Sequence, residues 1–143
     1  MSSINKMKMK RFLLLPAVMV IVLSQLSAQE QVKIPAGISL AFKAGNSSAL
    51  AEYLNSTVEL TLLDKEDFYS KSVAENILGD FFKKYHVREF TVRHQGQGAK
   101  NDAQYVIANL VTDKGNFRVY FLLKKVDTTP LIHQIRIEPD VER

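Results

Sequence analysis

Histidines and carboxylates are the side chains of this sequence best suited to chemistry. The sequence holds three histidines, His86, His94 and His133, and no cysteine. The lack of cysteine excludes disulfide scaffolds, thiolate zinc sites and cysteine nucleophiles. Carboxylates gather in a charged turn over residues 64–67, but without the Asp-x-Asp-x-Asp-Gly run of a calcium loop, so we expect them to be solvated. His86 follows a predicted helix and is expected at the surface.

Strand alternation places the other two histidines. His94 shares a register with Phe90, and His133 shares one with Ile135, so both are predicted to point toward the core side of a sheet. In a meander they would lie at the same sheet edge, three strand spacings or roughly 14 Å apart. That separation is too large for a shared metal ion or a hydrogen-bonded pair. We therefore predict no metal and no cofactor, and two alternatives stay open: each histidine lines a pocket, or is satisfied at the end of the core.

Three helices are predicted from apolar spacing and capping residues. The first opens at Pro35 and ends at Gly45, and Asn46 can cap a second short helix. The most secure helix covers about residues 72–85, where Ser72 and Glu75 form a capping box before a broad apolar stripe.

Alternating apolar residues predict strands over residues 57–63, 87–95, 104–112, 117–126 and 131–138. The last four follow one another through short links, which is typical of an antiparallel meander. With a tight turn at Lys114-Gly115, we predict that Thr112 faces Phe117. The fold class is therefore α+β, with the N-terminal helices and the long helix packed on an antiparallel sheet.

Both faces of the two middle strands are apolar, although only one can meet the helices. A sheet with one face in water normally alternates, and a large exposed apolar patch usually marks an interface. We therefore expect a homodimer through the outer face. Its candidate residues are Tyr105, Ile107, Val111, Tyr120 and Leu122.

The first 28 residues read as an export signal. They contain four of the 19 basic residues and none of the 15 acidic ones. The basic residues come first, a twelve-residue uncharged apolar run follows them, and small residues end the segment at Ala28. The run is shorter than the ~20 residues of a bilayer span. We predict a signal peptide over residues 1–28, cut near Ala28, and a single periplasmic or secreted domain over residues 29–143 with no membrane attachment after cleavage. That domain carries 15 basic and 15 acidic residues, so its balanced charge argues against nucleic-acid binding.

Two helices, a strand, a long helix and four strands resemble the nuclear transport factor 2-like cone, also called the cystatin-like fold. More narrowly, residues 34–139 resemble an exported bacterial family, domain of unknown function 4783. The segments that carry this resemblance are Leu40-Ala-Phe42, Val58-Glu-Leu-Thr-Leu62, Phe81-Phe82 and Ile135-Arg-Ile137-Glu138. The resemblance implies a curved sheet around the long helix, a pocket between them, dimerisation through the outer sheet face and export to a Gram-negative envelope.

We expect a non-catalytic module that binds a small molecule in the cone pocket, or a protein. The pocket candidates are Phe42, Phe81, Tyr85, Phe90, His94, Phe121 and His133. The first alternative is a small lyase- or isomerase-like enzyme with His94 or His133 as base, although no inward Asp or Glu is evident on the sheet. The second is a structural partner that binds a larger envelope protein through the Tyr105–Leu122 face.

Overall fold

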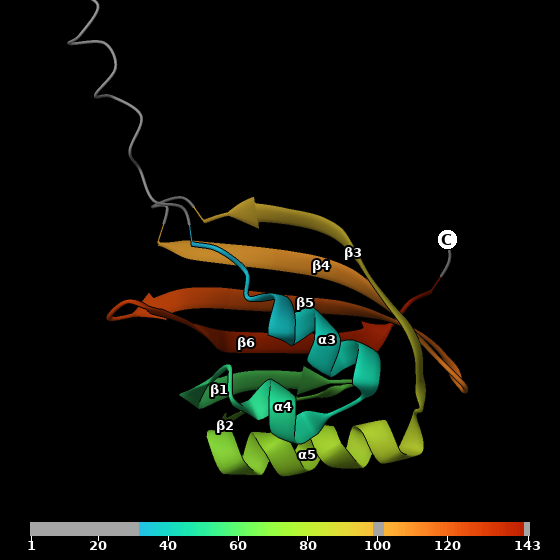
Figure 1. Cartoon of the computed structure of the whole chain (residues 1–143). Coiled ribbons are helices and arrows are strands. Elements are labelled where there is room, and N and C mark those ends of the chain that lie inside the picture. The colour runs from blue at the N-terminus through green and yellow to red at the C-terminus, as the bar shows by residue number, and fades with distance from the viewer. Residues whose placement is uncertain (1–31, 99–101, 142–143) are drawn as a thin grey trace, which may run out of the picture. The chain divides into compact units, whose positions relative to one another are not determined.

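The computed structural model describes residues 32–98 and 102–141 (Figure 1). The predicted signal peptide and the cut near Ala28 lie outside these residues, as does part of the predicted loop after Gly98. No helix in the described ranges is both long and apolar enough to cross a membrane.

Helices α3 (Ala36–Ala44) and α4 (Ser47–Ala51) form where their capping residues predicted them. Gly45 ends α3 in the left-handed conformation at φ 60°, where glycine carries no Cβ penalty. The side chain of Asn46 accepts a hydrogen bond from the Ala49 amide at 3.0 Å and so caps α4.

The long helix α5 (Lys71–Lys84) begins earlier than predicted. Ser70, not Ser72, caps it, because the Ser70 hydroxyl accepts the Val73 amide at 3.4 Å. The predicted capping box is therefore wrong. The buried face of α5 is Ala74, Leu78, Phe81 and Phe82, so Val73 stays 44% exposed.

Six strands form one sheet in the order β2-β1-β6-β5-β4-β3. Its neighbours are antiparallel except β1 and β6, which run parallel. The predicted charged turn is shorter than expected, since β2 begins at Lys65 and pairs back on β1. The strands are β1 (Leu54–Leu62), β2 (Lys65–Ser70), β3 (Val87–Gln97), β4 (Ala103–Thr112), β5 (Gly115–Val126) and β6 (Thr129–Pro139).

The β4–β5 hairpin has the predicted faces but a register displaced by two residues. Leu110, not Thr112, is the partner of Phe117, and Thr112 is the partner of Gly115. The loop is therefore the two residues Asp113 and Lys114. The Thr112 hydroxyl donates to the Gly115 carbonyl at 2.7 Å and accepts the Lys114 amide at 3.2 Å, which holds the tighter turn. A shift by an even number of residues keeps every side chain on its predicted face.

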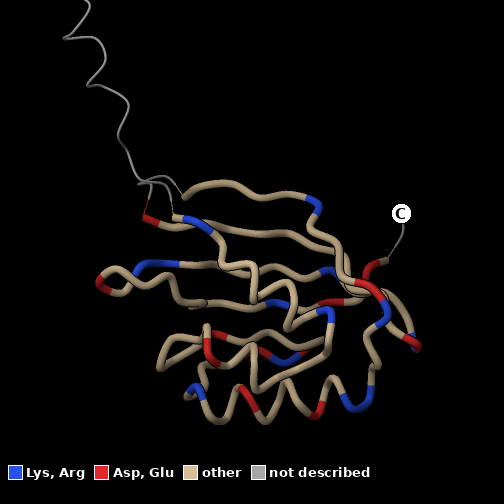
Figure 2. The backbone as a smooth tube through the Cα atoms, in the orientation of Figure 1, with Lys and Arg blue, Asp and Glu red and all other residues tan. Residues whose placement is uncertain are grey.

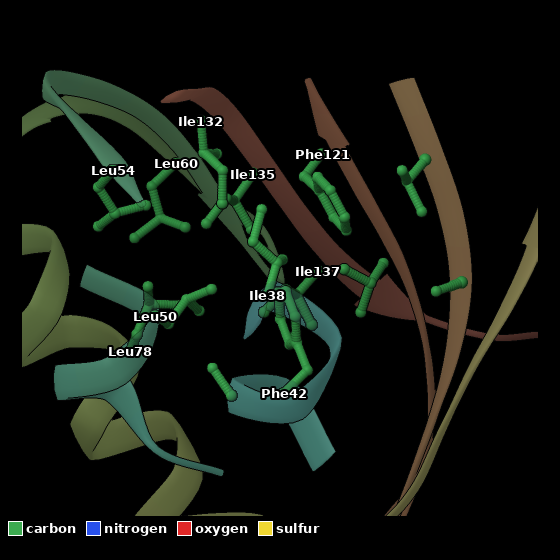
Figure 3. Close-up of a cluster of buried hydrophobic side chains, with 14 of the residues drawn as sticks. Ile38, Phe42, Leu50, Leu54, Leu60, Leu78, Phe121, Ile132, Ile135 and Ile137 are labelled. Atoms are coloured by element: carbon green, nitrogen blue, oxygen red, sulfur yellow. The ribbon is translucent and has the colours of Figure 1, made fainter. Parts of the chain in front are cut away.

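The helices cover one face of the curved sheet, and the core lies between them (Figures 1 and 3). Helix α3 sends Ile38 and Phe42 toward the strands, and α5 contacts β1 and β2. Acidic and basic residues are interspersed along the described chain (Figure 2). The fully buried large side chains are Phe42, Phe121, Ile38, Leu50, Leu54, Leu60, Leu78, Leu110, Leu123, Ile132, Ile135 and Ile137.

Candidate functional site

Three of the predicted pocket aromatics pack on one another. The Phe42 ring stacks on Phe90 with centroids 4.7 Å apart and on Phe121 at 5.9 Å, and it meets Phe82 edge to face at 6.3 Å. These are contact distances for aromatic pairs and leave no room for a ligand between the rings. The space that the sequence predicted as a cone pocket around Phe42, Phe90 and Phe121 is therefore filled by their own side chains.

The other two predicted aromatics, Phe81 and Tyr85, lie at the end of α5. Their centroids are 4.8 Å apart, and both rings meet Phe117 edge to face, at 5.3 Å and 5.0 Å. Phe81 and Tyr85 also border a cleft, whereas Phe90 of the Phe42 stack borders a separate surface hollow between α3 and β3. The predicted pocket residues thus divide into a filled core and a partly open site.

This cleft, of about 370 Å³, lies between α5 and the β1–β2 hairpin, and we call it the α5 cleft. Ionisable side chains reach it from Lys65, Asp80 and Lys84, and the Lys84 ammonium lies 5.5 Å from the centroid of the Tyr85 ring. The apolar and aromatic lining is Leu60, Leu62, Leu63, Tyr69, Ile77, Phe81 and Tyr85.

Leu63 has an unusual backbone in the turn between β1 and β2. Its φ is 59°, and its amide donates to the Ile137 carbonyl at 2.8 Å. A leucine in this left-handed region costs roughly 1–2 kcal/mol, which a turn avoids with glycine or asparagine. This left-handed conformation places the Leu63 side chain on the wall of the α5 cleft. Sequence reasoning missed this residue, although two consecutive leucines, Leu62 and Leu63, before a charged turn break the strand alternation and could have signalled it.

His94 does not point to the core side, so that prediction is wrong. A β-bulge between Val92 and His94 leaves Arg93 as an extra residue and reverses the alternation beyond it. Val92 pairs with Ala108 on the inner face, but His94 pairs with Ile107 on the outer face. The His94 side chain is exposed, with its ring centroid 5.9 Å from that of Tyr105.

His133 lies at a second bulge. Leu122 pairs with Gln134 and Leu123 with Ile132, so His133 is the extra residue of β6. Strict alternation from Ile135 would place Ile132 on the outer face, but the bulge turns it fully into the core. Nε2 of His133 is buried without a hydrogen-bond partner among the described residues. Burial, together with the charge of Lys124, lowers the pKa of His133.

His86 lies at the surface, as predicted, and joins the end of α5 to the β4–β5 turn. Its amide donates to Oδ1 of Asp113 at 2.9 Å, and its Nδ1 is 3.1 Å from Oδ2 of the same carboxylate. The Asp113 amide donates to the His86 carbonyl at 3.0 Å. The hydrogen bond from the His86 amide lowers the pKa of Asp113. This pair has a structural role and lies outside the α5 cleft.

The predicted dimer residues lie together on the outer face. Tyr105, Ile107 and Val111 come from β4, and Tyr120 and Leu122 from β5. All five are partly exposed. Tyr105 pairs with Leu122 and Ile107 with Tyr120, so these four residues form a continuous patch across the two strands. Val111 lies further along β4, beyond the Asn109–Arg118 pair. No three described residues of the kinds that bind metal ions come together in a cluster.

Comparison with solved structures defines the class of this fold. The chain is similar to a cystatin-like domain of unknown function from Nostoc punctiforme, with a TM-score of 0.60 and 9% identity over 74% of this chain and 72% of that chain. It is also similar to a protein of the nuclear transport factor 2-like family from Streptomyces avermitilis, with a TM-score of 0.55 and 9% identity over 74% of this chain and 90% of that chain. These likenesses establish a nuclear transport factor 2-like, cystatin-like fold.

The family follows from stronger matches. The crystal structure of a DUF4783 family protein from Bacteroides ovatus has a TM-score of 0.72 and 41% identity, over 76% of this chain and 97% of that chain. The family model of DUF4783, a domain of unknown function, matches residues 35–138. The chain therefore belongs to the DUF4783 family. No curated protein matches it.

Proposed function

We propose that this protein is an exported, non-catalytic binding module that holds an amphiphilic anion in the α5 cleft. The observation that carries the proposal is the composition of that cleft: an apolar wall with two lysines and one aspartate, Lys65, Lys84 and Asp80, among its lining residues. The volume of about 370 Å³ is in the range of small-molecule sites. An aliphatic tail would pack on the wall while a carboxylate headgroup reached the lysines.

The side chains of the cleft favour binding over catalysis. None of the three histidines is among its lining residues. His94 is exposed on the other face of the sheet, and His86 is bonded to Asp113. Lys65, Lys84 and Asp80 supply charge for recognition rather than an enclosed acid–base pair.

A chain-length series tests the ligand class. Each buried methylene contributes about 0.8 kcal/mol, so affinity should rise roughly fourfold per CH₂ from hexanoate to dodecanoate until the cleft is full. Isothermal titration calorimetry below the micelle concentration measures the trend. Equal affinities along the series, or no saturable binding, would refute the proposal.

A matched pair of variants on α5 locates the site. Ile77 lines the cleft, whereas Val73, one turn earlier, is 44% exposed and lies outside it. Ile77→Ser should weaken dodecanoate binding about tenfold, because it places a hydroxyl in an apolar wall. Val73→Ser should leave binding unchanged. An equal effect of the two substitutions would place the ligand elsewhere.

Export is proposed from residues 1–28 and is tested separately. In a Gram-negative host, N-terminal sequencing of the periplasmic fraction should find a mature chain that starts at Gln29. A chain that retains Met1 in the membrane fraction would contradict cleavage.

As a second proposal, the partly exposed Tyr105–Leu122 patch forms a homodimer. The patch has the aromatic character that interface cores favour, with the Tyr105 and Tyr120 rings stacked at 6.5 Å. Sedimentation should show a dimer that Leu122→Glu dissociates. Leu40→Glu, at a 63% exposed leucine on α3, is the matched control and should remain dimeric. A wild-type monomer at high concentration would exclude the homodimer and favour a different protein partner.

A further inference from the structure

A second hollow lies on the outer face of the sheet, away from the α5 cleft. Its volume is about 380 Å³, and strands β4, β5 and β6 form its floor. Tyr120 is the register partner of both Ile107 and Arg136, and Arg118 is the partner of Glu138. The lining residues are Ile107, Arg118, Tyr120, Gln134, Arg136 and Glu138.

The charges of this hollow are incompletely paired. It contains two guanidinium groups, Arg118 and Arg136, and one carboxylate, Glu138. The contact from Arg136 Nε to Glu138 Oε1 is long, at 3.7 Å, and Nε is buried without a hydrogen-bond partner in the described part of the chain. Arg118 makes no ion pair with any described residue. One further negative charge would balance the lining.

A neighbouring carboxyl group, Glu59 on β1, supplies that charge only in part. The hydrogen bond to Glu66, burial and the Glu66 charge raise the pKa of Glu59 and outweigh the charge of Arg136, which lowers it. Thr61, the register partner of Arg136, is 6% exposed, and its hydroxyl has no partner among the described residues. Arg136 Nε in the hollow and the neighbouring Thr61 hydroxyl are therefore donors without a partner in the described part of the chain.

Tyr120 and Ile107 provide an apolar wall beside these donors. Burial raises the pKa of Tyr120, so its phenol stays protonated and can donate a hydrogen bond. Gln134 contributes an amide that can donate as well. The combination of an apolar wall and several neighbouring donors suits a small molecule with one carboxylate on a planar apolar body.

We infer that the outer-face hollow binds a small carboxylic acid, with Arg118 and Arg136 contacting the carboxylate and Tyr120 packing on its apolar body. Arginine is suited to this role because its planar fork donates two hydrogen bonds to one carboxylate. The site is independent of the α5 cleft, but it shares Ile107 and Tyr120 with the proposed dimer patch. A carboxylate from a second copy is therefore the competing occupant.

Benzoate and its uncharged counterpart benzamide are the probes. Calorimetric titration should show saturable benzoate binding and at least tenfold weaker benzamide binding, since a hydrogen-bonded charge is lost. Arg136→Gln and Arg118→Gln should each weaken benzoate binding about tenfold. Arg93→Gln, at an exposed arginine on β3 outside the hollow, is the matched control and should bind as the wild type does. Circular dichroism confirms that each variant is folded.

Two outcomes would overturn the inference. One is that benzoate and benzamide bind with equal affinity, or that the wild type, Arg136→Gln and Arg118→Gln all bind benzoate with equal affinity. The other is found by sedimentation at the same concentrations: if the wild type is a dimer that does not bind benzoate, while the monomeric Leu122→Glu variant does, the hollow belongs to the interface. Binding of the fatty-acid series to the α5 cleft is tested separately with Ile77→Ser. A negative result for one site therefore leaves the proposal for the other testable.

Discussion

Replacing Phe42 by alanine tests whether the interior of the cone is a packed core or a ligand pocket. Phe42 is fully buried and contacts the rings of Phe90, Phe121 and Phe82. Truncating a buried phenylalanine costs about 3–5 kcal/mol, and each lost aromatic pair adds roughly 0.5–1.5 kcal/mol beyond area. We expect Phe42→Ala to lower the free energy of unfolding by about 4 kcal/mol, a large part of the ~5–15 kcal/mol typical of a domain.

Urea denaturation measures this change, and the slope with urea should be unaltered if only the folded state is destabilised. Phe68→Ala is the control, because Phe68 is 67% exposed on β2 and its loss should change stability by less than about 0.5 kcal/mol. The variant should also gain a dry cavity that binds benzene, which the wild type does not bind there. A loss of about 1 kcal/mol or less for Phe42→Ala would refute the packed core, because it would mean that Phe42 lines an open space.

Three further substitutions test the β1–β2 turn beside the α5 cleft and the loss of stability at low pH. Leu63→Asn removes both the strain of a leucine at φ 59° and an apolar side chain from the wall of the α5 cleft. Calorimetry should show a lower dodecanoate affinity, while thermal stability changes little. Unchanged affinity would argue against Leu63 as a ligand contact. Asp113 has a lowered pKa, so its stabilising effect is present above its unfolded pKa near 3.8 and is lost as the pH falls through its folded pKa. Asp113→Asn should flatten this pH dependence of stability in acid unfolding. An unchanged profile would contradict a stabilising role of the Asp113 carboxylate. His133 also has a lowered pKa, so protonation favours the unfolded state as the pH falls below 6.5, its pKa in the unfolded chain. His133→Gln should remove that loss of stability in thermal melts between about pH 5 and pH 7. An identical pH dependence of the variant and the wild type would exclude this role.

Local sequence patterns predicted the helices and most strand faces correctly. Asn46 and Gly45 act at the helix ends where their types indicated, because capping depends on a few adjacent backbone groups. The residues of β4 and β5 predicted to face outward all lie on the outer face despite the register shift. The capping box failed because Ser70 and Ser72 both suit an N-cap, and the position of the β1–β2 hairpin decides between them.

The candidate sites were less predictable, because bulges and long-range pairing determine them. Strict alternation predicts an inward His94, but one extra residue in β3 reverses its side. The α5 cleft combines Ile77 and Tyr85 of the helix with Leu62 of β1 and Tyr69 of β2, which no local spacing connects. The outer hollow depends on the β5–β6 register that brings Arg118 and Arg136 near each other.

The sequence by itself determined the α+β class, the caps of α3 and α4, the two-faced apolar middle strands and the gathering of excess basic charge in the first 28 residues, before a charge-balanced remainder. These features follow from periodicity and from neighbours within a few residues. Only the tertiary structure decided the parallel pairing of β1 with β6, the filled space around Phe42 and the outward side of His94. Packing decides such features, because where a bulge forms and which rings meet depend on contacts between residues far apart in the chain.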